Sequence, residues 1–227
     1  MKIGLQFAMA AELHALPGAE FLAPMETISG VPFYQIAPGI VAAEGGIGKV
    51  NAAMTAELLC REYGVDLILN AGVAGCLTDL PTGTLVVVDE FIQHDVDTTA
   101  VGDPVGLVST INQTAFSTWH PEKCQKLLET LGYPAEIGRV ATGDWFAVQG
   151  QRAEFIRDTF HPVLTEMEGG AIAQVCFRNG ISCVAVKSVS DHLFSDKQQD
   201  EYFDYDQALK NMGAIVLPLA ELLQRER

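Results

Sequence analysis

Short apolar runs alternate along the chain with longer segments in which apolar residues recur every three or four positions. The short runs are rich in aliphatic and β-branched residues, which is typical of buried strands, whereas the longer spacing is typical of helices. We expect strands at Ile3–Phe7, Leu67–Leu69, Leu85–Val88, Val140–Thr142, Val163–Thr165 and Cys183–Val186. The alternation predicts βα units and therefore an α/β fold.

Three segments have the apolar spacing of helices that face a core. Their apolar stripes are Val50, Met54 and Leu58; Ile172, Val175 and Cys176; and Ala208, Met212, Ile215, Leu219 and Leu222. The last stripe predicts a C-terminal helix that closes the fold. Pro218 interrupts this helix and is expected to kink it, because proline lacks the N–H that the helix ladder needs.

The chain has 227 residues, which fits one large domain over residues 1–227 better than two small cores. No run of Pro and Ser and no run of like charges divides it, so we expect no linker. The segment Val101–Trp119 is unusual because it has no charge after Asp103 and is rich in hydroxyl residues. Its length and composition predict a functional loop or a surface that a partner covers.

Composition narrows the possible partners. Apolar residues make up 48% of the chain, enough for a buried core, and 14 basic against 29 acidic residues give a net charge of −15. A surface this acidic repels phosphate backbones and anionic lipids, so we expect neither nucleic acid nor a membrane as a partner. The five cysteines show no CxxC pair, which favours a reducing, cytoplasmic location. The apolar start of the chain is interpreted as a strand and not as a signal peptide.

Several predicted strands run into short segments of small, acidic or aromatic residues. In open α/β sheets, ligands bind beyond the carboxyl ends of the strands, so we expect these segments to converge on one crevice. The segments are 9–12, 70–75, 143–146, 166–168 and 187–191.

Three carboxylates in these segments indicate hydrolytic chemistry. Taken alone, Glu12 and Glu168 are ordinary acids at helix starts, and Asp191 is a cap for the turn after its strand. Together they offer the paired acid and base that hydrolysis needs, provided that burial separates their pKa values. Trp145 and Phe146 read either as core aromatics or as a stacking surface for a base.

The segment Gly46–Ala52 is similar to two nucleotide-binding motifs but fits neither. It lacks the last glycine of a dinucleotide fingerprint, and Asp66 begins the next strand where the fingerprint requires an acid at the strand's end. Val50 follows Lys49 where a phosphate loop requires Ser or Thr. We therefore expect neither a nicotinamide cofactor nor ATP.

Metal and nucleophile signals are weak. His94, Asp95 and Asp97 are more typical of a hydrogen-bonded corner than of a metal site. No Gly-x-Ser-x-Gly elbow presents a nucleophilic serine, so covalent catalysis is not indicated.

The chain resembles the 5′-methylthioadenosine/S-adenosylhomocysteine nucleosidases of the purine nucleoside phosphorylase superfamily. The resemblance rests on Met9–Glu12, Gly46–Ala53, Asn70–Gly75, His94–Asp97, Thr142–Asp144, Glu166–Ala173 and Ser190–Asp191. It implies a single three-layer domain around a central twisted mixed sheet flanked by helices. It also implies a homodimer, no metal or organic cofactor, and irreversible cleavage of adenine from a 5′-thio-substituted ribose.

The resemblance further implies roles for individual residues. Asp191 would protonate adenine N7 with help from Ser190, and Glu12 would activate the attacking water. Glu168 and the adjacent Met167 would hold the ribose, while Phe146 stacks on the adenine. The other residues implied at the substrate are Met9, Ile47, Val73, Ala74, Gly75, Glu166 and Lys187.

Two departures from the family pattern bear on the water. Val73 stands where a hydroxyl residue is usual, and Lys187 stands where an arginine is usual, so the positioning of the water is expected to differ. The segment from Val101 lacks the family's aromatic-rich pattern around the 5′ substituent.

Three alternatives remain open. A nucleoside phosphorylase would use phosphate instead of water, but the chain has no arginine before Arg61 to clamp that dianion. A nucleosidase for another 5′-modified adenosine, such as aminodeoxyfutalosine, would share the chemistry. A purine-binding module without activity would not need Glu12, Glu168 and Asp191 together.

Overall fold

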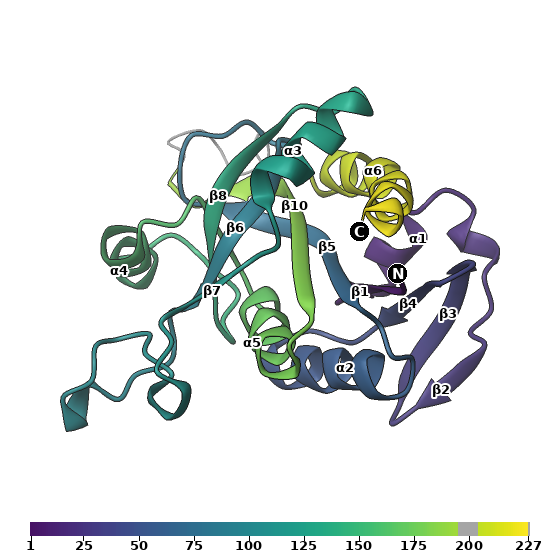
Figure 1. Cartoon of the computed structure of the whole chain (residues 1–227). Helices are drawn as coiled ribbons and strands as arrows, with labels where there is room; N and C mark the ends of the chain where they lie inside the picture. The colour runs from purple at the N-terminus through teal and green to yellow at the C-terminus, as the bar shows by residue number, and fades with distance from the viewer. Residues whose placement is uncertain (195–203, 227) are drawn as a thin grey trace.

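The computed structural model describes residues 1–194 and 204–226. In these ranges ten strands form one mixed sheet in the order β10-β6-β8-β9-β5-β1-β4-β3-β2, with β7 paired to β6 (Figure 1). The strands are β1 (Ile3–Phe7), β2 (Glu26–Ile28), β3 (Val31–Ala37), β4 (Ile40–Glu44), β5 (Leu67–Cys76), β6 (Leu85–Gln93), β7 (Ala115–Ser117), β8 (Ala135–Thr142), β9 (Leu164–Glu166) and β10 (Ser182–His192).

The sheet closes on itself over half of its width. Strand β10 pairs in parallel with β5 and antiparallel with β6. Strand β9 joins β8 to β5, so β5, β10, β6, β8 and β9 form a ring. The sequence analysis assumed an open sheet, and this is wrong for the half of the sheet that forms the ring. The order of apolar and polar residues along the chain does not show that a strand pairs on both sides with distant strands.

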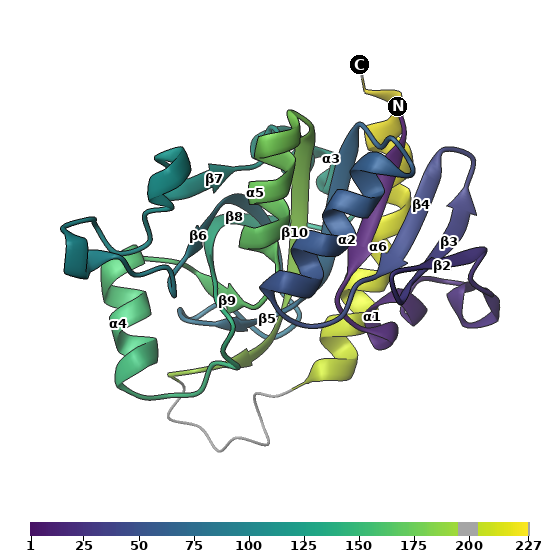
Figure 2. The same ribbon diagram turned by 90° about the horizontal axis from the view of Figure 1, so that it is seen from below.

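Helices cover both faces of the sheet. Helices α2 (Lys49–Arg61) and α5 (Gly169–Asn179) pack side by side on one face, and α1 (Ala10–His14), α3 (Pro121–Thr130) and α6 (Tyr205–Arg225) lie on the other (Figures 1 and 2). Helix α4 (Gln151–Phe160) packs at one end, and the 3-10 turns are η1 (Ala19–Phe21), η2 (Thr99–Val101) and η3 (Ser109–Ile111). This arrangement confirms the α/β prediction with a mixed sheet flanked by helices.

Two buried clusters hold the layers together. Alternate residues of β10 enter different clusters: Val184 and Val186 join the one that contains α6, whereas Cys183 and Ala185 join the one that contains α2 and α5. The reason is that successive side chains of a strand point to opposite faces. A strand that is buried on both faces has a continuous apolar run in its sequence, which is why β10 could be predicted from the sequence.

Every predicted strand is present, but four, β5, β6, β8 and β10, are longer than their apolar runs. Strand β5 continues through residues 70–75, and β10 continues through Asp191. The segment 70–75, which was expected to follow the strand, is therefore part of it. The physical reason is that this half of β5 pairs along its length with β10, and small residues fit where the backbone lies close to neighbouring groups.

The predicted core face of α2 is wrong. Val50 is 80% exposed and Met54 is 37% exposed. The buried face instead carries small or short residues together with one leucine, and small side chains let the helix lie close to the sheet and to α5. These residues are Ala52, Thr55, Ala56 and Leu59.

The segment Val101–Trp119 is only partly exposed. Val101 at its start is 80% exposed, but Phe116 in β7 is buried and packs edge-on against Phe177, with ring centroids 5.9 Å apart. The expectation that Phe116 needs a partner chain is therefore wrong, because α5 already covers it.

The predicted C-terminal helix is confirmed as α6, one continuous helix that passes through Pro218. Its end lies near the start of β1, where the Gln224 amide donates to the Met1 carbonyl at 3.2 Å (Figure 2). None of the helices in the described ranges combines the length and apolar content needed to cross a membrane.

Candidate active site

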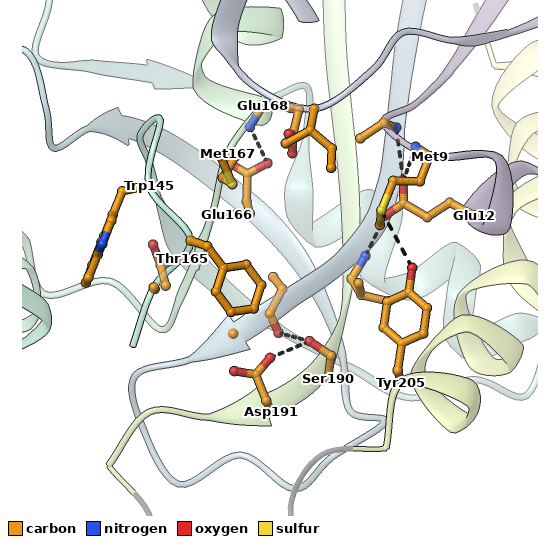
Figure 3. A pocket seen from close by; sticks show the side chains of 17 residues that line it. Met9, Glu12, Trp145, Thr165, Glu166, Met167, Glu168, Ser190, Asp191 and Tyr205 are labelled. Carbon is orange, nitrogen blue, oxygen red and sulfur yellow. Dashed lines mark hydrogen bonds between the residues drawn. The ribbon is translucent and has the colours of Figure 1, made fainter. Parts of the chain in front are cut away.

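A cavity of about 340 Å³ opens where β1, β5, β8 and β10 end (Figure 3). It brings together segments that lie up to 197 positions apart in the sequence, from Ala8 to Tyr205. The predicted residues in its wall are Met9, Glu12, Ile47, Val73, Ala74, Gly75, Phe146, Glu166, Met167, Glu168, Ser190 and Asp191. The structure therefore brings twelve of the thirteen predicted residues to one cavity, whereas Lys187 does not line it.

Glu12 is buried at the start of α1. Its Oε2 accepts the backbone N–H groups of Ala8 and Met9 at 2.9 and 3.1 Å, and its Oε1 accepts that of Val73 at 3.2 Å. Burial raises the pKa of Glu12, while Lys187 and the three backbone donors oppose that rise. Gly72 is needed here because a Cβ at this position would lie 2.5 Å from Glu12 Oε1.

Ser190 and Asp191 sit at an irregularity of β10. The pairing of β10 with β5 shifts register between Val189 and Asp191, and such a bulge re-aims the side chains beside it. The Ser190 hydroxyl contacts the Ala74 carbonyl at 3.2 Å and Asp191 Oδ1 at 2.6 Å. The bulge thus brings the Asp191 carboxyl to the cavity wall with a hydroxyl beside it.

Glu168 precedes α5 and lies across the cavity from Asp191 (Figure 3). Its Oε1 accepts the backbone N–H of Gly48 at 2.8 Å. Burial, followed by repulsion from Glu166, raises the pKa of Glu168 to about 7. Near neutral pH this carboxyl therefore exchanges readily between its two protonation states.

Glu166 and Lys187 form a buried ion pair below the cavity wall. Lys187 Nζ lies 3.1 Å from Glu166 Oε2, and each side chain is only 3% exposed. The position of Lys187 differs from the sequence expectation that it borders the substrate. The reason is that Lys187 lies within the long strand β10, four residues before Asp191, and not in a loop.

Aromatic and thioether side chains form the rest of the wall. Phe146 is 72% exposed, so its ring is free to stack, whereas Trp145 is already covered by Arg152 at 4.5 Å. The hydroxyl of Tyr205 lies 3.8 Å from the sulfur of Met9.

Trp145, which the sequence analysis considered together with Phe146, also lies in the wall, and sequence reasoning missed four further wall residues: Ala8, Ala147, Thr165 and Tyr205. Three of these four directly adjoin predicted site residues in the sequence, so extending each predicted segment by one position would have included them. Tyr205 had no such signal, because only folding brings the start of α6 beside β1.

Lys49 is engaged outside the cavity. Its Nζ lies 2.6 Å from Asp95 Oδ1, and its backbone N–H donates to Asp144 Oδ1 at 2.8 Å. Asp95 Oδ2 in turn accepts the backbone N–H of Asp144 at 2.9 Å. Within residues 1–194 and 204–226, His, Cys, Asp and Glu nowhere gather in threes that could hold a metal.

The charged groups in the cavity wall are all carboxylic: Glu12, Glu166, Glu168 and Asp191. No Lys or Arg is among the described residues that line it. Such a wall suits a neutral ligand on which positive charge develops, because carboxylates stabilise that charge electrostatically.

Comparisons with known proteins identify the family of this chain. A family model described as the phosphorylase superfamily matches residues 2–221. A 5′-methylthioadenosine/S-adenosylhomocysteine nucleosidase of Shewanella putrefaciens is 35% identical over 207 residues, which are 88% of this chain and 90% of that protein.

Solved structures are similar over nearly the whole chain. The structure of a 5′-methylthioadenosine/S-adenosylhomocysteine nucleosidase of Colwellia psychrerythraea in complex with adenine has a TM-score of 0.83 and 32% identity, and covers 98% of this chain and 96% of that one. Futalosine hydrolase of Helicobacter pylori has a TM-score of 0.87 and 25% identity, and covers 98% of both chains. The family suggested by the motifs is thereby confirmed: the chain belongs to the phosphorylase superfamily and, within it, to the 5′-methylthioadenosine/S-adenosylhomocysteine nucleosidases.

Proposed function

We propose that the protein hydrolyses the N-glycosidic bond of 5′-thio-substituted adenosines, such as methylthioadenosine and S-adenosylhomocysteine, and releases adenine. The observation that carries this proposal is the cavity wall, where Glu12, Glu168 and Asp191 border one space. The Shewanella putrefaciens relative is named for this activity, and the Colwellia psychrerythraea structure holds adenine.

Asp191 acts as the general acid toward N7 of the adenine. Protonation lets the base leave neutral while positive charge builds on the ribose, and such proton transfer typically contributes ~10²–10⁴ in rate. The hydrogen bond from Ser190 to Asp191 Oδ1 supports this role, because it orients the carboxyl group.

Glu12 acts as the general base. It takes a proton from the water that attacks C1′ of the ribose, while the electrons of the broken C1′–N bond stay with the adenine. Its burial and raised pKa support this role, because a base is most effective when its pKa lies near the working pH. Water thus supplies the hydroxyl group of the free sugar and leaves its second proton on Glu12, while Asp191 gives its proton to adenine. Loss of the proton from Glu12 to solvent and uptake of one by Asp191 restore both groups.

The remaining wall residues bind the substrate. Glu168, beside Met167, accepts hydrogen bonds from the ribose hydroxyls, and the exposed ring of Phe146 stacks on the adenine. Apolar contacts come from Met9 and Ile47, and the part of β5 at Val73, Ala74 and Gly75 forms the wall beside the base.

A nucleoside phosphorylase is the nearest rival. Its phosphate would bring nearly two negative charges next to Glu12 and Glu168 and would need cationic donors. Lys187, the cation beside these groups, is paired with Glu166. Water is therefore the expected nucleophile.

Product analysis across a phosphate titration tests this choice. We expect adenine to be released at the same rate at every phosphate concentration, with a free thio-sugar as the other product. A rate that rises in proportion to phosphate, with a sugar 1-phosphate accumulating, would establish the phosphorylase reaction instead.

A second candidate substrate is a different 5′-modified adenosine of the aminodeoxyfutalosine type. The similarity in fold to futalosine hydrolase favours it. The 35% identity to a methylthioadenosine and S-adenosylhomocysteine nucleosidase favours the thio substrates. Comparing kcat/KM for methylthioadenosine, S-adenosylhomocysteine and aminodeoxyfutalosine decides between them.

We also propose that the protein is a cytoplasmic homodimer. Apolar side chains exposed near the cavity mouth and in the first turn of α2 support the dimer, because such groups are costly to leave in water. They are Ile47, Val50 and Phe146. Five cysteines without a disulfide support a reducing location.

A further inference from the structure

Both carboxylate oxygens of Glu166 are hydrogen-bonded to the protein. Its Oε2 accepts the backbone N–H groups of Glu168 at 3.1 Å and Gly169 at 2.7 Å, as well as the Lys187 ammonium at 3.1 Å. Its Oε1 accepts the hydroxyl of Thr142, so both oxygens are bonded to the protein. Although Glu166 borders the cavity, its carboxylate is turned to the protein behind it.

These bonds fix the start of α5. A helix begins with free backbone N–H groups, and an anion at that end satisfies them and complements the helix dipole. Glu166 takes the first two of these N–H groups, and Thr142 Oγ1 accepts the third, from Gly170, at 2.8 Å. Since Glu168 is the residue immediately before α5, the same bonds set the position of its side chain.

Lys187 provides the countercharge for this arrangement. It is fully buried, and burial alone lowers the pKa of a lysine. Attraction from Glu166, Glu168 and Glu12 more than offsets that effect, so the pKa of Lys187 is raised and it stays protonated. In return, Lys187 lowers the pKa of both Glu12 and Glu168 against the effect of their burial.

We propose that Lys187 is a positioning residue of this enzyme: it holds Glu166 as the anion that anchors the start of α5, and its buried charge favours the ionised forms of Glu12 and Glu168. The proposal rests on the nucleosidase function proposed above. It assigns neither Glu166 nor Lys187 a contact with the substrate.

The test is Lys187→Met, which keeps the length of the side chain and removes the charge. Without the cation, the pKa of Glu12 rises, so the acidic limb of the kcat/KM against pH profile moves to higher pH. We expect the acidic limb to move by about half a pH unit or more. Lys123→Met is the matched control, because it removes a lysine paired with Glu226 at a partly exposed position; its profile should match the wild type.

A binding measurement reports on Glu168 separately. A 5′-methylthio C-nucleoside, which has no cleavable C–N bond, is compared with its 2′-deoxy form by calorimetry at pH 7.5. Lys187→Met leaves Glu166 unopposed, which raises the pKa of Glu168 further and weakens its bonds to the ribose. The preference for the 2′-hydroxyl should fall by about tenfold.

The double variant Lys187→Met with Glu166→Gln removes both charges, and so avoids a buried unpaired carboxylate. It replaces the single variant in both measurements if the single variant does not fold. We expect the acidic limb to stay displaced, because Glu12 still lacks the cation, while the 2′-hydroxyl preference recovers in part.

The outcomes separate the two proposals. If folded variants keep the wild-type limb and the wild-type ribose preference and lose only thermal stability, Lys187 is merely structural and the inference is wrong. If the wild type cleaves no nucleoside at all, the proposed function fails, while the calorimetric comparison still tests the role of Lys187.

Discussion

At the scale of single residues, the carboxyl groups of this cavity have different surroundings. Burial raises the pKa of Glu168 to about 7, and it raises the pKa of Glu12 as well, although Lys187 and three backbone donors oppose the rise at Glu12. Glu166 is bonded on both oxygens. Chemically identical side chains thus become suited to different tasks through their surroundings.

The acid assignment is testable by Asp191→Asn. The amide keeps the shape of the side chain and can still accept the Ser190 hydrogen bond, but it has no proton to transfer to the base. We expect nucleoside binding to persist while kcat falls ~10²-fold or more, which is roughly 3 kcal/mol of transition-state stabilisation. Single-turnover kinetics with methylthioadenosine measures this.

The matched control is Asp66→Asn, since Asp66 is exposed at the opposite end of β5 and its Oδ2 accepts the backbone N–H of Lys2 at 2.7 Å. It should keep the wild-type rate. An Asp191→Asn variant with most of its activity intact would show that another group protonates the base.

At the scale of elements, the site depends on two strands that continue beyond their apolar runs. The second halves of β5 and β10 pair with each other and bring Val73 next to Glu12 and Ala74 next to Ser190. Small side chains there leave room for the carboxylates. The strands therefore supply both the scaffold and the space of the cavity.

Gly72→Ala tests whether the position of Glu12 depends on the lack of a side chain at this point of β5. The new Cβ would lie 2.5 Å from Glu12 Oε1, so the carboxylate must move. A displacement of about 1 Å in a catalytic group can cost ~10²-fold, and we expect a loss of this order in kcat/KM. Steady-state kinetics on the folded variant checks it.

Gly4→Ala in the neighbouring strand β1 is the control. There the added Cβ meets side-chain atoms of Leu59, the nearest at 3.1 Å, and no residue of the cavity wall. It should cost little activity. Equal losses in the two variants would mean that crowding in the sheet, and not the position of Glu12, limits the rate.

At the scale of the whole molecule, the exposed apolar side chains bear more directly on self-association than the net charge of −15 does. Val50 and Met54 have the spacing of a core stripe yet lie in solvent on α2. Ile47 and Phe146, at the cavity mouth, are exposed as well. A second copy of the chain would cover this surface and would also border the cavity.

Val50→Asp tests the dimer. A charge in the centre of the proposed contact should weaken association at least about tenfold, because an unpaired charge is costly to bury. Sedimentation velocity at micromolar concentration should show a dimer for the wild type and mainly monomer for the variant. Phe21→Asp, at an equally exposed position in η1, should remain a dimer. A wild-type monomer at these concentrations would contradict the proposal.

Much of the fold was predictable from the sequence because it depends on local patterns. Buried parallel strands produce apolar runs, and α6 produces a regular stripe, so their existence and order could be read directly. The twelve wall residues were also predictable, since each is part of a short motif near the carboxyl end of a strand or the start of a helix.

Tertiary structure decided what depends on contacts between distant segments. The closure of β10 onto both β5 and β6, the buried face of α2 and the approach of Tyr205 to Met9 have no local signal. The same holds for Lys187: its residue type indicated a charge, but only the folded chain buries that charge against Glu166 and away from the cavity. Sequence patterns indicate which side chains are buried away from water. Tertiary packing determines which neighbours each buried side chain contacts, and the pKa values and hydrogen bonds of the site depend on those neighbours.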